Sequence, residues 1–284
     1  MFSSYRCPKW GLHNLNGNFA ADLVDIREVW DSNLAEELSL IISIVADYPF
    51  VSMDTEFPGV AVLPVVTSPT SLTEFNYQTL QLNVNILKLI QLGLTFFDSS
   101  GHLPSFGSPP RPCIWQFNFR EFDVARDIFD RSSIELLRRS GIDLEKNHCL
   151  GISADHFSKL IIASGIVQNN SVQWITFNGR FDLGFLIKTL TCHNLPDSQQ
   201  DFYRSLRLYF PKVYDIKHLM SFRSNFPDEL NKVAEELGVN RAGTCHQTGS
   251  DSLLAAAVFR RLKDHFLCGS VERYAGVLRG LSSD

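Results

Sequence analysis

Four of the acidic residues in this chain of 284 residues lie at three separate places, each at the expected end of a strand or helix. They are Asp54 with Glu56, then Asp182, and finally Asp251, which follows His246 by five residues. A fold that brings one strand end and two helix starts together places four carboxylates and an imidazole in a single cleft. Such a set of ligands is what two-metal hydrolysis of a phosphodiester requires.

The first acidic pair lies in a segment that alternates as a β-strand does. In residues 50–56 (FVSMDTE), Asp54 and Glu56 are two positions apart and therefore project from the same face. Val51 and Met53 project from the opposite face and can anchor the strand in a core. A carboxylate pair at a strand end is well placed to hold a divalent cation. The alternative is an Asp-x-Glu pair that is merely solvated on an edge strand.

Asp182 follows a predicted buried strand, residues 172–177, and a turn that contains glycine. It opens a predicted helix, residues 181–190, where the helix dipole favours negative charge. On its own this position is typical of an acid that only decorates a helix N-terminus.

The third place combines two kinds of chemistry. Asp251 lies in the first turn of a predicted helix with an apolar face, and His246 lies on the preceding loop. This spacing can put an imidazole beside a carboxylate-bound metal ion, where it can accept a proton from attacking water. A single loop histidine is more often a surface residue, so the argument depends on all three places together.

The order of predicted elements indicates an α/β fold with a mixed central sheet flanked by helices. An antiparallel meander of three strands comes first, and helices alternate with strands afterwards. Residues 1–20 are predicted to be a flexible segment and residues 21–284 a single domain. The predicted strands are 50–56, 90–97, 113–119, 172–177 and 213–214, and the predicted helices are 33–46, 80–89, 132–140, 154–165, 181–190, 199–208, 227–237 and 251–266, with a loop at 63–74.

Composition narrows the class of protein. A hydrophobic content of 44% is ample for a buried core. The net charge of −5 argues against binding nucleic acid through a broad basic face, although bound cations can attract phosphate instead. The six cysteines are scattered singly, which disfavours structural zinc and is typical of reduced thiols. No apolar run is long enough to cross a membrane, and we expect a location in the nucleus and cytoplasm.

Electrostatics favours two divalent ions among these acids. Two carboxylates ~4 Å apart repel each other by roughly 4 kcal/mol at an effective dielectric constant near 20. Four converging acids accumulate several such repulsions, so the cluster should take up protons or bind cations. A site rich in oxygen suits Mg²⁺ or Mn²⁺ better than zinc.

The same residues carry a resemblance to a known family. The order Asp-x-Glu, Asp and His-x4-Asp resembles the histidine-bearing (DEDDh) branch of the DEDD 3′→5′ exonuclease superfamily. The segments SMDTEFPGV, NILKLIQLGLTFF, WQFNF, SIELLRRSGID, YFPKVYDIKHLM and HQTGSDSLL are similar to the Ccr-associated-factor (Caf/Pop-type) deadenylases. These are the poly(A)-specific ribonuclease subunits of the Ccr–Not complex, and the similarity covers residues 24–266.

The resemblance implies a ribonuclease-H-like fold and removal of adenylates from mRNA 3′ ends. It implies that Asp54, Glu56, Asp182 and Asp251 bind two divalent metal ions, and that His246 is the general base. It further implies three partners: the 3′ end of poly(A) RNA, the Ccr–Not scaffold subunit and a Ccr-type nuclease subunit.

Phe57 follows Glu56 directly and is a candidate substrate-binding residue, because an aromatic ring can stack on the terminal base. Packing of Phe57 in the core is an equally good interpretation. By contrast, Asp215 in the segment YDIKH is interpreted as structural, although its surroundings resemble those of a catalytic acid.

One departure from the family pattern concerns the third acid. The family usually has His-Ser-Gly-Tyr before it, whereas this chain has Asn178, Gly179, Arg180 and Phe181. The acid itself is present, so metal binding should survive. An alternative hypothesis is therefore a weakly active or inactive adaptor of the same fold, which links the Ccr–Not scaffold to another nuclease.

Overall fold

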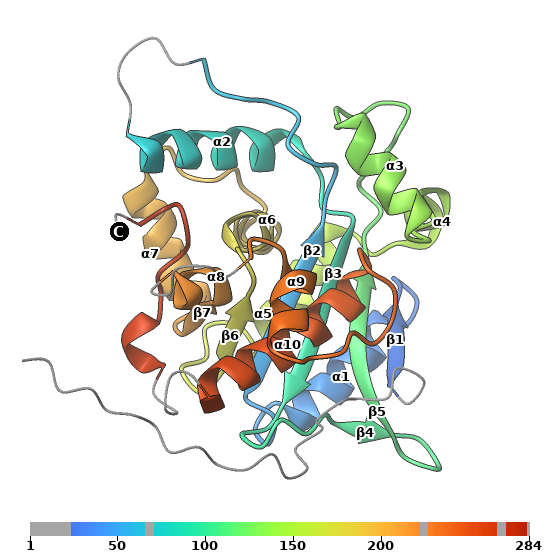
Figure 1. Cartoon of the computed structure of the whole chain (residues 1–284). Coiled ribbons are helices and arrows are strands. Elements are labelled where there is room, and N and C mark those ends of the chain that lie inside the picture. Colours follow the sequence, from blue (N-terminus) through green and yellow to red (C-terminus); the bar gives the residue numbers. More distant parts are fainter. Residues whose placement is uncertain (1–23, 66–70, 222–226, 266–270, 283–284) are drawn as a thin grey trace, which may run out of the picture.

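A mixed β-sheet forms the centre of the computed structural model, which describes residues 24–65, 71–221, 227–265 and 271–282 (Figure 1). In the described residues the strand order is β1-β5-β3-β2-β6-β7, and β4 pairs with β5. β2 and β5 run antiparallel to β3, whereas β1, β6 and β7 join by parallel pairing. The strands are β1 (Asp25–Val29), β2 (Phe50–Glu56), β3 (Gln91–Phe97), β4 (Ser105–Phe106), β5 (Arg111–Asn118), β6 (Gln173–Thr176) and β7 (Val213–Asp215).

Helices cover both faces of this sheet, which confirms the predicted α/β class. One layer packs on the face that carries Val51 and Met53, and consists of α1 (Leu34–Ile44), α2 (Leu72–Ile86), α5 (Ala154–Ala163), α6 (Arg180–Thr191) and α7 (Gln199–Tyr209). The other layer packs on the face that carries Phe50 and Ile175, and consists of α8 (Ile216–Met220), α9 (Leu230–Glu236) and α10 (Thr248–His265). Figure 1 shows α10 lying across the sheet on this second face.

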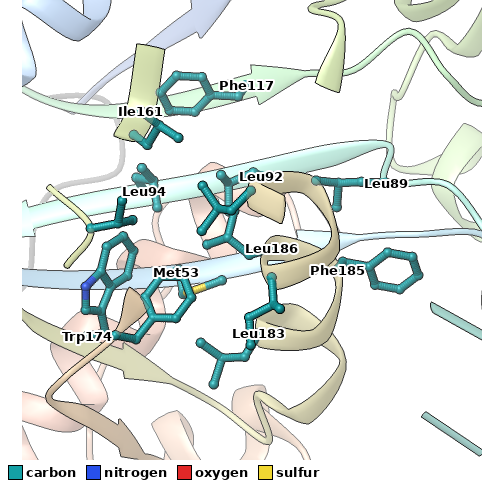
Figure 2. Packing of buried hydrophobic residues seen from close by; sticks show 14 of the residues in the cluster. Met53, Leu89, Leu92, Leu94, Phe117, Ile161, Trp174, Leu183, Phe185 and Leu186 are labelled. Carbon is teal, nitrogen blue, oxygen red and sulfur yellow. The ribbon is translucent and has the colours of Figure 1, made fainter. Parts of the chain in front are cut away.

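The larger core lies between the sheet and α6. Figure 2 shows Leu183 and Leu186 of α6 beside Met53 and Leu92 of the central strands. Each of these four side chains is at most 2% exposed. Full burial of a side chain of this size contributes ~1.5–3 kcal/mol, so this contact fixes α6, and with it Asp182, against β2.

A smaller cluster lies outside the two main layers. It contains Ile134 and Leu137 of α3 (Arg131–Arg139) and Leu144 of α4 (Leu144–Leu150). The turn after β2 packs on this unit, because the Asp130 backbone N–H donates to the Pro58 carbonyl at 2.9 Å. The end of β2, where the acids lie, is therefore fixed from this side as well.

The meander and most of the predicted helices are present, but one helix was misplaced and several short elements were not predicted. The structure places a helix at Leu72–Ile86 where we predicted a loop to residue 74 and a helix at 80–89. The cause is the Ser71 hydroxyl, which accepts from the Glu74 backbone N–H at 3.1 Å and starts the helix a full two turns earlier. The strands β1 and β4 and the helices α4 and α8 were not predicted either; each is short, and the longest, α4, has 7 residues.

The described chain ends in a segment that packs back onto the sheet. Leu278 and Leu281 are buried in the larger core, and the Gly276 backbone N–H donates to the Val213 carbonyl at 2.8 Å. The flexible segment predicted at residues 1–20 lies outside the described residues. Among the described helices, none combines the length and apolar character that a membrane span needs.

Candidate active site

The end of β2 presents the first two acids to the N-terminal end of α10. Asp54 is half-buried and pairs across the sheet with Gly93 of β3. The backbone of Thr248, the first residue of α10, lies directly over Gly93, where a Cβ atom would overlap the Thr248 carbonyl. The missing side chain at Gly93 therefore lets α10 approach the strand that carries Asp54.

The start of α10 brings three predicted site residues together. Glu56, His246 and Asp251 each offer a ligand atom, and these atoms lie within 4.8 Å of one another. His246 adopts a left-handed backbone conformation with φ 61°, and its N–H donates to Asp251 Oδ2 at 2.9 Å. Its Nδ1 lies 4.0 Å from Glu56 Oε1, and the side chain is 44% exposed. The imidazole is thus open to solvent beside two carboxylates.

Asp182 reaches the same strand end but lies outside that trio. It is buried in the first turn of α6, as predicted. Its Oδ1 accepts from the Thr55 backbone N–H at 3.0 Å and from the Thr55 hydroxyl at 2.5 Å. Thr55 is the residue between the two strand acids, so Asp182 is fixed within hydrogen-bond reach of the segment that carries them.

The acids share an environment that disfavours their charged forms. Burial and the charges of Asp251 and Asp182 raise the pKa of Glu56 to about 8. Burial raises the pKa of Asp182 to about 7, against the hydrogen bonds from Thr55. Burial, with the charges of Asp182, Asp251 and Glu56, also raises the pKa of Asp54 well above its usual range. The charges on all four acids therefore act on one another.

The sequence did not predict one cation at this site. Arg241, on the loop between α9 and α10, lies 2.5 Å from Asp251 through its Nη2 atom. Its charge opposes the rise in the pKa of Asp54. Nothing in the local sequence signals this contact, because Arg241 precedes Asp251 by ten residues and meets it only through the fold of the loop.

Phe57 packs among aromatic side chains of α6. Its ring centroid lies 5.3 Å from that of Phe181 and 4.7 Å from that of Phe185. The side chain packs against the core and is half-buried, so base stacking by Phe57 stays a prediction. This aromatic contact links the segment after Glu56 to the turn before Asp182.

The turn before Asp182 contains a residue in the left-handed conformation and a buried arginine. Asn178 adopts φ 60°, a left-handed conformation that asparagine tolerates better than most residues. The Arg180 guanidinium lies over the Phe181 ring, 5.5 Å from its centroid. Within the described part of the chain, the buried Arg180 Nε has no hydrogen-bond partner.

Asp215 is structural, as predicted. Its carboxylate is buried and accepts three backbone N–H groups, from Asn178 at 2.9 Å, Lys217 at 3.0 Å and Arg279 at 2.9 Å. These bonds join β7, the turn before Asp182 and the C-terminal segment. Since its oxygens are used in this way, Asp215 stabilises the scaffold around the site.

The donor set fits a divalent cation. It consists of carboxylate oxygens and one imidazole, a combination that Mg²⁺ and Mn²⁺ accept. Carboxyl groups whose pKa values are raised by burial and by mutual repulsion gain most from a cation that neutralises them. The geometry can therefore hold a metal ion between the end of β2 and the start of α10.

Comparisons of the sequence agree with this chemistry. The chain matches the CAF1 family ribonuclease over residues 29–159 and 154–259. It is 55% identical over 260 residues to a probable CCR4-associated factor 1 homolog 7 of Arabidopsis thaliana, covering 92% of this chain and 94% of the relative. It is also 40% identical over 284 residues to the poly(A) ribonuclease pop2 of Schizosaccharomyces pombe, covering 100% of this chain and 82% of the relative.

Solved structures with the same fold confirm the predicted ribonuclease-H-like class. The Mg²⁺- and Mn²⁺-bound form of S. pombe Pop2p superposes with a TM-score of 0.84 at 42% identity, covering 90% of this chain and 99% of that one. The structure of the yeast NOT1 MIF4G domain co-crystallised with CAF1 superposes with a TM-score of 0.73 at 34% identity, covering 90% of this chain and 97% of that one.

Proposed function

Because the chain belongs to the CAF1 family of ribonucleases, we propose that it is a metal-dependent 3′→5′ exoribonuclease that shortens mRNA poly(A) tails and releases AMP. The observation that carries this proposal is the meeting of Glu56, His246 and Asp251 within 4.8 Å. A shared fold alone does not imply a reaction, so the argument depends on these side chains.

The acids would hold two divalent cations, Mg²⁺ or Mn²⁺. Asp54 and Glu56 approach from β2, Asp251 from α10 and Asp182 from α6. When bound, the cations lower the pKa of water and stabilise charge on the attacking and leaving oxygens. The metal-bound form of S. pombe Pop2p supports this assignment of metals.

His246 would act as the general base. Its imidazole is exposed to solvent next to Glu56, so a water molecule that enters the cleft can reach it. The hydrogen bond that the His246 backbone N–H donates to Asp251 fixes the loop that carries the imidazole. Proton transfer from water to a positioned imidazole contributes typically ~10²–10⁴-fold in rate.

Two relatives support the proposed protein partners. The yeast NOT1 MIF4G domain was co-crystallised with CAF1, which supports binding of a Not1-type Ccr–Not scaffold by this chain. The name CCR4-associated factor of the Arabidopsis relative supports a Ccr-type nuclease as second partner. Action on mRNA tails would place the protein in the nucleus and cytoplasm, and a fluorescent fusion tests that prediction.

An oligoadenylate assay tests the activity. We expect the full chain with Mg²⁺ or Mn²⁺ to shorten a 5′-labelled oligoadenylate stepwise and to release AMP. Asp54→Asn keeps the size of the side chain but removes the carboxylate, and should lower the rate by about 10²-fold or more, since loss of a direct ligand costs at least as much as loss of an outer-shell partner. An unchanged rate would count against the proposal.

Two controls distinguish the alternatives. Competition between poly(A), mixed-sequence RNA and DNA separates a deadenylase from a general exonuclease. The adaptor hypothesis predicts binding to a Not1 MIF4G domain without Mn²⁺ binding or trimming. Retention of all four acids and His246 in one cleft argues against it.

A further inference from the structure

Arg241 makes three side-chain hydrogen bonds beside the candidate active site. It lies after α9, and its side chain is only 17% exposed. Three of its nitrogen atoms donate to three different groups: Nε to Asn231 Oδ1 at 2.8 Å, Nη1 to Ser250 Oγ at 2.8 Å and Nη2 to Asp251 Oδ1 at 2.5 Å. The planar guanidinium therefore joins α9 to the first turn of α10.

The groups that receive these bonds are themselves fixed. The Ser250 hydroxyl donates to the Ala242 carbonyl at 2.6 Å, which ties the loop back to α10. The Asn231 side-chain amide donates to Cys245 Sγ at 3.2 Å, next to His246. Arg241 is thus the centre of a network that touches both Asp251 and the loop that carries the imidazole.

The network fixes the orientation of the Asp251 carboxylate. Oδ1 accepts from Arg241 and Oδ2 accepts from the His246 backbone N–H at 2.9 Å. With one donor on each oxygen, rotation of the carboxylate would break a charge-assisted hydrogen bond, which is stronger than a neutral one. In this orientation a carboxylate oxygen of Asp251 lies within 4.8 Å of a ligand atom of Glu56 and of His246.

We propose that Arg241 is a positioning residue, which fixes the orientation of Asp251 and thereby sets the affinity of the cleft for divalent cations. The inference rests on the proposed function, because it assumes that Asp251 is a metal ligand. Electrostatics alone predicts a different role, in which the positive guanidinium repels the bound cation and weakens its binding. The two roles predict opposite effects of removing Arg241.

Titration calorimetry with Mn²⁺ at fixed pH distinguishes them. Arg241→Lys keeps the charge but cannot form the planar three-way fork, and Arg241→Met loses both. Both substitutions should raise the Kd for Mn²⁺ by about 10–100-fold, the usual effect of losing a group that orients a metal ligand. A Kd of Arg241→Lys within about twofold of wild type, or tighter binding by Arg241→Met, would overturn the proposal.

Asn231→Leu provides a test that leaves every charge in place. It removes the acceptor of Arg241 Nε, and should raise the Kd in the same direction by a smaller factor. If the Arg241 variants fail to fold, the Kd of Asn231→Leu for Mn²⁺ tests the proposal instead, and a Kd equal to that of wild type refutes the positioning role. Arg204→Lys is the matched control, because Arg204 pairs with Asp201 at the same 2.5 Å but on the exposed side of α7; its Kd should not change.

Kinetics separates positioning from a general structural defect. With oligoadenylate, Arg241→Lys should need about tenfold more Mn²⁺ for half of its maximal rate, and should reach a rate within about threefold of wild type at saturating Mn²⁺. A loss of rate that saturating Mn²⁺ does not restore contradicts the inference. If the wild-type protein binds no Mn²⁺, the proposed function itself fails; if it binds and Arg241→Lys binds equally well, only the role of Arg241 fails.

Discussion

At the scale of residues, three carboxyl groups of the site, those of Asp54, Glu56 and Asp182, have raised pKa values and bind protons more tightly than ordinary acids do. Burial is the first cause, and repulsion among Asp54, Glu56, Asp182 and Asp251 adds to it. Thr55 works in the opposite direction on Asp182, since its hydroxyl and N–H stabilise the charged form. A site of this kind exchanges protons for cations, so metal binding and pH are linked.

The metal-free protein should lose stability as pH rises. Glu56 titrates near 4.5 when unfolded and at about 8 when folded, so between these values the folded state holds a proton that the unfolded state has lost. The contribution of Glu56 to the free energy of unfolding is fully present below pH 4.5 and is lost as the pH rises toward 8, by at most about 1.4 kcal/mol per pH unit for each titrating group. Thermal unfolding in EDTA from pH 6 to 9 should show a falling Tm.

Glu56→Gln is the control for this effect, because the amide does not titrate. Its Tm should fall less steeply over the same range than that of wild type. Added Mn²⁺ should stabilise wild type increasingly as pH rises, since it binds the deprotonated acids. If the Tm of wild type does not change with pH, or falls as steeply as that of Glu56→Gln does, Glu56 does not have the raised pKa that the account requires.

At the scale of elements, the close approach of α10 to the sheet depends on one glycine. Gly93→Ala places a methyl group against the Thr248 carbonyl, which is backbone and cannot rotate away. The start of α10 must shift, and Asp251 shifts with it. We expect a loss of about 2–3 kcal/mol in unfolding free energy, measured by urea denaturation, together with weaker Mn²⁺ binding.

Gly184→Ala is the matched control on α6. The nearest atoms to a Cβ atom there belong to side chains and not to backbone, with Leu80 Cδ1 at 3.0 Å and Val84 Cγ2 at 3.2 Å, so a shift of a few tenths of an ångström relieves the contact. The gain of about 1 kcal/mol in helix propensity offsets that crowding. Stability and metal affinity should therefore stay close to wild type, and an equal loss in both variants would contradict the special role of Gly93.

Elements whose apolar residues follow a clear period were predictable from the sequence. β2, β3 and β5 were found close to their expected bounds because each buries a continuous or alternating apolar face. β1 was missed because only Val29 in it is buried, and its pairing with β5 is a tertiary event. The start of α2 was missed because the Ser71 cap lies in a polar stretch without apolar periodicity.

At the scale of the whole molecule, distant segments converge to build the site. The acids come from β2, α6 and α10, and the loop with His246 and Arg241 closes the arrangement. The acids were predictable from the three places taken together and from the family resemblance, since each place alone has an ordinary interpretation. Thr55 and Arg241 were not, since their roles follow from contacts across 127 and 10 positions of the sequence. The net charge of −5 fits a surface on which bound cations, in place of a basic face, attract the phosphates.

The most direct test that the four acids form one metal centre is a crystal structure of the protein soaked in Mn²⁺, with the ions located by anomalous scattering. We expect two peaks ~3.5–4 Å apart, coordinated between them by Asp54, Glu56, Asp182 and Asp251, with His246 facing the cleft beside them. No peak in the cleft, or ions that leave Asp182 and Asp251 uncoordinated, would contradict the assignment of these residues to one catalytic centre.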